Sequence, residues 1–275
     1  MTSPPALPSP GGWLHRYAML VCAATFLLII AGGLVTSTGS GLAVPDWPLS
    51  FGQVFPRMEG GVLFEHGHRM IATLVGALTV GLAIWTARVE PRGWVRALGW
   101  AMVAVVVTQG VLGGITVLMR LPDAVSVAHA GLAQIFFALT AVMATVSSPR
   151  FSQPGVSVPT TDHRPPAVDT STLTVITALA IYAQILLGAI VRHTGAALAI
   201  PDFPLSFGRL VPSFTTSLVM WNYLHRLGGL LVAVLIGWTA FRIAARHGTS
   251  RYLGRPAAFL IALICGQILL GALTI

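Results

Sequence analysis

Seven long apolar runs dominate the sequence and constrain its fold more than any other feature. They cover residues 17–36, 62–87, 97–119, 124–146, 171–191, 218–241 and 257–275, and charged, proline-rich or glycine-rich stretches separate them. A helix of about 20 apolar residues crosses the hydrocarbon core of a bilayer. Each run therefore predicts one membrane-spanning helix, and we expect an all-α, polytopic membrane protein.

The composition excludes the soluble and nucleic-acid-binding classes. Only 9% of the residues are charged, whereas soluble proteins carry about 25%, and the mean hydropathy is +0.81. All sixteen basic residues are arginines, and most of them lie between the apolar runs instead of forming one patch. The net charge of +8 therefore does not indicate binding to nucleic acid. Cys22 and Cys265 lie inside apolar runs and identify no redox compartment.

Arginine placement predicts the orientation of the chain in the membrane. One set of connections holds ten arginines: Arg16, Arg88, Arg92, Arg96, Arg150, Arg164, Arg242, Arg246, Arg251 and Arg255. The other set holds four: Arg57, Arg120, Arg192 and Arg209. Cytoplasmic loops carry the excess of basic residues. We therefore expect a cytoplasmic N-terminus and a location in the cell (inner) membrane.

The two halves of the chain are copies of each other. TGSGLAVPDWPLSFG from Thr38 recurs as TGAALAIPDFPLSFG from Thr194, with 11 of 15 positions identical. HRMIATLVG from His68 recurs as HRLGGLLVA, and QGVLGGITV from Gln109 recurs as QILLGALTI. An even number of spans per copy keeps both copies in the same orientation, so the repeat is parallel.

Each copy is expected to form one bundle of four helices. Residues 1–146 make the first bundle, residues 171–275 make the second, and the polar, proline-rich stretch 147–170 reads as a cytoplasmic linker. Gly110 and Gly114 are expected to let helix backbones approach closely within the first bundle. The second bundle has only three helices, because the position equivalent to His129 falls about twelve residues beyond Ile275.

Three histidines lie inside the predicted spans, where an ionisable side chain costs a few kcal/mol. His68, His129 and His225 each fall a few residues inside the outer end of a helix. His68 and His129 belong to the second and fourth helices of one bundle, an arrangement that suits the two axial ligands of a heme iron. The alternative is that these histidines only form hydrogen bonds between helices. Zinc is disfavoured, because no Cys, Asp or further His completes a tetrahedral set.

Glu65 marks a difference between the two copies. It precedes His68 by three residues, so both side chains project from one helix face. The second copy has Asn222 at that position, which suggests that one bundle does chemistry and the other holds a cofactor. The alternative is that Glu65 only pairs with Arg69 one turn away. His66 points away from this face and is left out of the predicted site.

Two further features accompany the histidines. Arg69 and Arg226 each follow a histidine directly, and each cation could meet a heme propionate or extend towards water. The PDWPLSFG and PDFPLSFG loops contain Trp47 and Phe203, which suit a membrane interface or a lid over a planar ring.

Taken together, these motifs resemble those of the heme A synthase family of bacterial and mitochondrial membranes. The resemblance extends from Tyr17 to Ile275 and rests on four stretches: TGSGLAVPDWPLSFG, Glu65-His66-Gly67-His68-Arg69, TQGVLGGITV with His129 downstream, and Asn222-Tyr223-Leu224-His225-Arg226. It implies eight helices in two bundles and an enzyme of heme A biosynthesis for terminal oxidases. That family oxidises a ring methyl of heme O to the formyl group of heme A.

The resemblance also implies roles for the candidate residues. Glu65 would be the catalytic residue, with His68 and His129 on the iron of the substrate heme in the first bundle. His225 would be an axial ligand of heme b in the second bundle, and both heme sites would lie near the outer face. An electron donor or acceptor and a heme O synthase that hands over the substrate are the implied partners. The oligomeric state stays open.

The chain departs from the family pattern in two places. Many bacterial members carry a cysteine pair in the first outer loop, at the positions expected to correspond to Val44 and Ser50. The eighth helix, which would supply the second histidine for heme b, is expected to be missing, so that the chain is truncated, heme b is five-coordinate, or a partner subunit completes the bundle. Two rival functions stay in view: a non-catalytic bis-histidine cytochrome that only transfers electrons, and a transporter built from parallel repeats.

Overall fold

Seven α-helices make up a computed structural model that describes residues 10–149, 151, 170–247 and 253–273. They are α1 (Pro10–Ser37), α2 (Gly61–Val89), α3 (Gly93–Leu118), α4 (Asp123–Val146), α5 (Thr170–His193), α6 (Ser217–His247) and α7 (Gly254–Ala272), with one 3-10 turn, η1 (Ala196–Leu198). Most of the expected linker 147–170 lies outside the described residues, as do Arg150, Arg164 and Arg251.

The all-α, polytopic membrane fold is confirmed. Each of the seven helices is long and apolar enough to cross a membrane. Over the described ranges the chain forms no strand, only isolated bridges between Ser50 and Gln53 and between Ser206 and Arg209. The protein is therefore a multi-pass integral membrane protein.

Several helices extend beyond the apolar runs that predict them. The first run begins at residue 17, but α1 begins at Pro10, and α6 continues past residue 241 to His247. The extension of α6 is supported by Arg246, which donates a 2.7 Å hydrogen bond to the Thr170 hydroxyl at the start of α5. Hydropathy marks the part of a helix in lipid, whereas backbone hydrogen bonding continues into the polar region.

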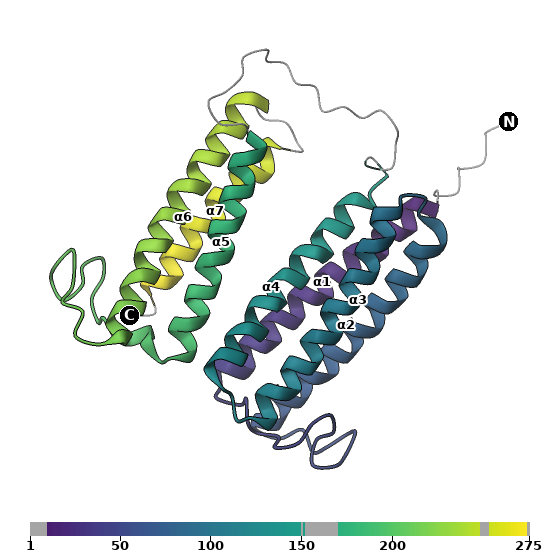
Figure 1. Cartoon of the computed structure of the whole chain (residues 1–275), viewed down its shortest axis with the longest axis horizontal. Helices are drawn as coiled ribbons and strands as arrows, with labels where there is room; N and C mark the ends of the chain where they lie inside the picture. Colours follow the sequence, from purple (N-terminus) through teal and green to yellow (C-terminus); the bar gives the residue numbers. More distant parts are fainter. Residues whose placement is uncertain (1–9, 150, 152–169, 248–252, 274–275) are drawn as a thin grey trace. The chain divides into compact units, whose positions relative to one another are not determined.

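The chain divides into two compact units, Met1–Ser157 and Val158–Ile275. In the first unit α1 contacts α2, α2 contacts α3, α3 contacts α4, and α4 closes the ring against α1. Figure 1 shows these helices running side by side, with the α1–α2 loop and the α3–α4 turn at the same end. The pairs α1–α3 and α2–α4 are therefore the diagonals of a four-helix bundle.

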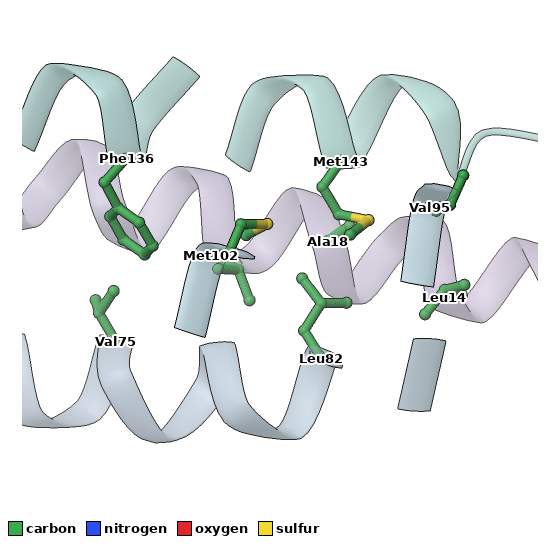
Figure 2. Close-up of a cluster of buried hydrophobic side chains, with 9 residues drawn as sticks. Leu14, Ala18, Val75, Leu82, Val95, Met102, Phe136 and Met143 are labelled. Carbon is green, nitrogen blue, oxygen red and sulfur yellow. The ribbon is translucent and has the colours of Figure 1, made fainter. Parts of the chain in front are cut away.

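The hydrophobic core of the first unit receives side chains from all four helices. Its buried members are Leu14, Ala18, Val21, Val75, Leu82, Val95, Met102, Phe136 and Met143. Figure 2 shows Phe136 of α4 and Val75 of α2 pointing towards each other. Side chains of the two diagonal helices α2 and α4 therefore meet in the centre of the bundle.

In the second unit α6 contacts both α5 and α7. The buried hydroxyls of Thr177 and Thr239 join α5 to α6 through a 2.7 Å hydrogen bond. Within the described part of this unit, α5 and α7 do not contact each other. The three helices thus repeat the arrangement of α1, α2 and α3.

The expectation for Gly110 and Gly114 is wrong. A Cβ at Gly114 would lie 2.6 Å from Cδ2 of Trp47, so this glycine accommodates an indole from the α1–α2 loop and not a helix backbone. A Cβ at Gly110 would meet no atom within 4 Å. The close approach of α2 and α3 occurs instead at Gly99, whose Cβ would lie 3.3 Å from Cα of Ala83.

An ion pair between the buried Glu90 and the partly exposed Arg92 closes the end of the first bundle opposite the α1–α2 loop. Arg92 donates to Glu90 at 2.7 and 2.9 Å and to the Val146 carbonyl at 2.8 Å. It thereby caps the C-terminus of α4 and joins it to the α2–α3 turn. These hydrogen bonds from the Arg92 side chain hold the pKa of Glu90 below its ordinary value.

We predict that Arg92→Ala lowers the thermal unfolding midpoint of the detergent-solubilised protein, because it leaves a nearly buried carboxylate unpaired. The expected cost is about 1–3 kcal/mol. Since the pKa of Glu90 is lowered on folding, the contribution of the pair is present above the ordinary pKa of 4.5 and is lost as the pH falls below it. Arg88→Ala, at an exposed position one turn away, is the control. Equal midpoints for both variants at neutral pH would contradict the prediction.

Candidate functional site

The three candidate histidines continue the buried faces of their helices. His68, Val75 and Leu82 on α2 recur every seven residues, as do His129, Phe136 and Met143 on α4. Residues two turns apart share a helix face, and the other members of both series lie in the core. His68 and His129 therefore face the bundle interior from diagonal helices, each about two turns from the end that carries the α1–α2 loop.

His225 follows the same pattern in the second unit. Val232 and Thr239, at the next positions of its series on α6, are buried. His225 thus faces the interior of its own unit, at the place on α6 that His68 occupies on α2.

Each histidine ring lies in a notch that a glycine leaves on a neighbouring helix. A Cβ at Gly32 of α1 would lie 3.1 Å from Cε1 of His68, and one at Gly113 of α3 would lie 3.3 Å from Cε1 of His129. In the second unit a Cβ at Gly188 of α5 would lie 2.9 Å from Cε1 of His225. Any larger residue would push the ring aside, so these glycines set the orientation of the imidazoles.

Two glutamines that the sequence analysis did not assign to the site hold the histidine backbones. Gln109 donates to the His129 carbonyl at 2.8 Å, and Gln184 donates to the His225 carbonyl at 2.7 Å. The Gln184 amide also lies 2.9 Å from Nδ1 of His225. The same amide nitrogen therefore donates to the backbone of His225 and lies against its ring.

Glu65 is buried at the start of α2 with both carboxylate oxygens occupied. Its side chain is 5% exposed. Oε2 accepts a 2.8 Å hydrogen bond from the Val44 N–H, and Oε1 accepts a 2.5 Å bond from Arg69. The ion pair between Glu65 and Arg69, which the alternative interpretation of Glu65 predicted, is present. The same carboxylate also binds the loop backbone at Val44.

Arg69 binds the loop that follows α1. Besides Glu65, its guanidinium donates to the carbonyl oxygens of Asp46 at 2.8 Å and Leu49 at 3.0 Å. In the second unit Arg226 donates to the equivalent carbonyls of Asp202 at 2.6 Å and Leu205 at 3.0 Å. Both arginines are therefore loop anchors, and a contact with a heme propionate stays a prediction.

At the position of Glu65 the second unit has an asparagine, which donates hydrogen bonds where the carboxylate accepts them. Asn222 is buried and donates through Nδ2 to the carbonyls of Ala196 and Ala197, each at 2.8 Å. It holds the short turn η1, whereas Glu65 accepts from the loop N–H of Val44. The two units thus share a scaffold but differ at the position beside the histidine.

An aspartate shapes the tip of each loop. Asp46 accepts from the N–H groups of Phe51 and Gly52, and Asp202 accepts from those of Phe207 and Gly208. These hydrogen bonds, that from Gly52 foremost, lower the pKa of the Asp46 carboxyl. They hold Phe51 at φ 53° and Phe207 at φ 55°, a conformation that costs a bulky residue energy.

Trp47 extends from the loop onto α3. Its ring lies against Gly114, the residue after the glycine that accommodates His129. The loop therefore reaches from the α1–α2 side of the bundle to α3 and covers the end nearest the histidines. This placement is consistent with the lid expected from the sequence.

The structure brings Glu65, His68 and Arg69 together on the first turns of α2 and places His129 at the same end of the bundle. His225 and Arg226 form the equivalent pair in the second unit. A hollow of about 430 Å³ beside the loop is lined by Phe51, Gln53, Pro56, Arg57, Glu59 and Val62, and none of the candidate residues borders it. Nowhere in the described ranges do three or more His, Cys, Asp or Glu side chains gather to hold a metal ion.

The chain is similar to known proteins over most of its length. Residues 15–275 match the model of the COX15-CtaA family, described as cytochrome oxidase assembly proteins. A heme A synthase from Symbiobacterium thermophilum is 34% identical over 265 residues, which cover 94% of this chain and 85% of the relative. Heme A synthases from Shouchella clausii and Alkalihalophilus pseudofirmus are 33% and 31% identical, covering 92% and 94% of this chain and 84% and 86% of the relatives.

We predict that Gly114→Val loosens the α1–α2 loop, because the added side chain occupies the space of the Trp47 ring. Trypsin cleavage after Arg57, whose side chain is 91% exposed, should become faster. Gly110→Val on the same helix is the matched control, since a Cβ there meets no neighbour. Equal cleavage rates in the two variants would show that the indole contact does not hold the loop.

Proposed function

This chain belongs to the COX15-CtaA family of cytochrome oxidase assembly proteins, and on that premise we propose that it converts heme O into heme A. It is an integral membrane oxidoreductase of heme A biosynthesis, as its similarity to heme A synthases supports. The family membership confirms the resemblance drawn from the sequence. The reaction oxidises a methyl group on the heme O ring to a formyl group.

We place the reaction in the first unit, and one observation carries this assignment. A buried carboxylate lies one turn from a candidate heme ligand in the first unit, where the second unit has an amide. The oxidation removes hydrogens from the methyl carbon, so protons leave as the reaction proceeds. A carboxylate can accept a proton or stabilise developing positive charge, whereas an asparagine can do neither well.

His68 and His129 suit the iron of the substrate heme. They face the interior from the diagonal helices α2 and α4, and the glycine notches orient both rings. A porphyrin brings four of its own ligands to iron, so two histidines complete the set without a larger cluster of protein ligands. The heme iron supplies the redox chemistry, and the protein supplies orientation, a nearby carboxylate and a covered site.

Glu65 is the residue that we assign to catalysis. Its carboxylate is aimed by the Val44 N–H and by Arg69, so its position is set before any substrate binds. Such preorganisation lets a charged group act without reorganising at the moment of reaction. Trp47, whose ring lies against Gly114, extends over this end of the bundle from the loop.

We assign a heme b to the second unit, where His225 would bind its iron. The Gly188 notch and the Gln184 amide support this assignment, because they hold the His225 ring and its backbone carbonyl in place. The heme there would pass electrons between the first unit and an external donor or acceptor. Arg226, one residue on, is the proposed partner of a propionate.

The surroundings of the protein follow from the arginine distribution. We propose that the N-terminus is cytoplasmic, that the protein lies in the cell membrane, and that both heme sites lie near the outer face. Arg57 and Arg209 lie in the loops at the histidine end, and Arg88, Arg92 and Arg242 lie at the opposite helix ends. A heme O synthase is the proposed source of the substrate.

A simple electron-transfer cytochrome explains the histidines equally well but gives no reason for the carboxylate in one unit alone. We predict that Glu65→Gln keeps heme bound but abolishes heme A formation when the chain is co-expressed with a heme O source. Extraction and chromatography of the hemes measures both results. Glu59→Gln is the control, because this carboxylate is exposed. Unchanged heme A in the Glu65 variant would contradict its catalytic role.

Gly32→Ala should displace the His68 ring and weaken heme binding in the first unit. Changes to groups that orient metal ligands typically cost about tenfold to hundredfold in affinity. Gly33→Ala is the matched control, because it adds the same methyl to the same helix where no neighbour lies within 4 Å. The amount of heme O retained per protein after purification measures the difference. Equal retention in the two variants would show that the Gly32 notch does not set the position of the His68 ring.

A further inference from the structure

Three side chains from the first turns of α2 fasten the α1–α2 loop in the first unit. Glu65 accepts from the Val44 N–H, His66 bonds to the Ser50 hydroxyl, and Arg69 donates to loop carbonyls. The function proposed above uses Glu65 and Arg69. It leaves unexplained the role of His66, which follows Glu65 in the sequence and forms the far end of the same network of contacts.

The contact between His66 and Ser50 is short and buried. Nδ1 of His66 lies 2.7 Å from Oγ of Ser50. His66 is 7% exposed, Ser50 is fully buried, and Nε2 of His66 is buried without a hydrogen-bond partner. This single bond is therefore what fixes the imidazole, and breaking it would leave buried polar atoms unsatisfied on both residues.

Ser50 also contacts the catalytic network. Nη1 of Arg69 lies 3.4 Å from the Ser50 hydroxyl, while Nη2 of Arg69 binds Glu65. A continuous path of polar contacts thus runs from His66 through Ser50 and Arg69 to the Glu65 carboxylate. Because the guanidinium is planar and rigid, a shift at one of its nitrogens moves the others.

The second unit keeps the serine but not the histidine. Ser206 is buried at the equivalent loop position, and Tyr223 stands in place of His66. Tyr223 packs edge-on against Phe214, with ring centroids 5.6 Å apart. The histidine–serine tie therefore occurs in the unit that has Glu65, and the unit that has Asn222 uses the same position for aromatic packing.

We propose that Ser50 and His66 are positioning residues for the oxidation of heme O, acting through Arg69 on the Glu65 carboxylate. This inference rests on the function proposed above and adds two residues to it. Neither residue needs to contact the substrate. Their effect is to hold the loop at Ser50, and with it the guanidinium that aims the carboxylate, in one arrangement.

The experiment compares Ser50→Ala, His66→Leu and His66→Asn with the native chain, using hemes supplied by a heme O source. Asparagine retains a hydrogen-bonding atom near the place of Nδ1, whereas leucine does not. Ser206→Ala is the matched control in the second unit. The two readouts are the kcat and KM for heme O conversion and the amide hydrogen exchange of peptides covering residues 42–53 and 198–209.

We expect Ser50→Ala and His66→Leu each to lower kcat about tenfold with little change in KM or bound heme. Amide exchange in residues 42–53 should rise in both variants, and His66→Asn should restore both readouts. The double variant should be no worse than either single one, because both remove the same bond. Ser206→Ala should change neither kcat nor exchange in residues 42–53.

Native kcat in Ser50→Ala would overturn the proposal, and so would a loss of turnover without faster exchange in residues 42–53. A native chain that forms no heme A would refute the proposed function. The hydrogen-exchange measurement distinguishes failure of the proposed function from failure of the present proposal. It reports whether the His66–Ser50 hydrogen bond holds the loop on α2, whether or not heme is converted. Unchanged exchange in both Ser50→Ala and His66→Leu would then exclude the tie itself.

Discussion

The absence of water from the bilayer core is the constraint on which this structure depends. Every backbone polar group in the membrane must be satisfied within the chain, so the spans are helices and irregular backbone is confined to their ends. The α1–α2 loop is the largest irregular segment of the first unit, and its exposed carbonyls need donors. Arg69 supplies them from α2. The same guanidinium binds Glu65, so one side chain both satisfies the loop carbonyls and positions the carboxylate.

Duplication explains how such a site could arise without disturbing the fold. The loop tip, the arginine anchor and the glycine notch for the histidine recur in both units with nearly the same contacts. Two adjacent differences lie beside the histidine, where Glu65 and His66 correspond to Asn222 and Tyr223. One scaffold thus carries a buried carboxylate beside the histidine in one copy and a buried amide in the other.

Much of the site could be predicted because its residues follow helix periodicity. The histidines continue the buried series through Val75, Phe136 and Val232, and their depth follows from their distance to the helix ends. Ser50, His66 and the partner of Gly114 could not be predicted this way, because a loop side chain and a helix side chain meet only through tertiary packing. The replacement of His66 by Tyr223 in the repeat was the one signal for His66, and it lies beside the Glu65 difference.

The sequence by itself determined the spans, the repeat, the three histidines and the carboxylate that distinguishes the copies, because hydropathy and helical spacing are local properties of the chain. Only the tertiary structure decided what those residues contact. It made α2 and α4 the diagonal of the bundle, turned Arg69 towards loop carbonyls, and gave Gly114 to the Trp47 ring instead of a helix backbone. Each of these contacts joins residues that lie far apart in the sequence. Which of them meet is decided by the close packing of all the helices against one another.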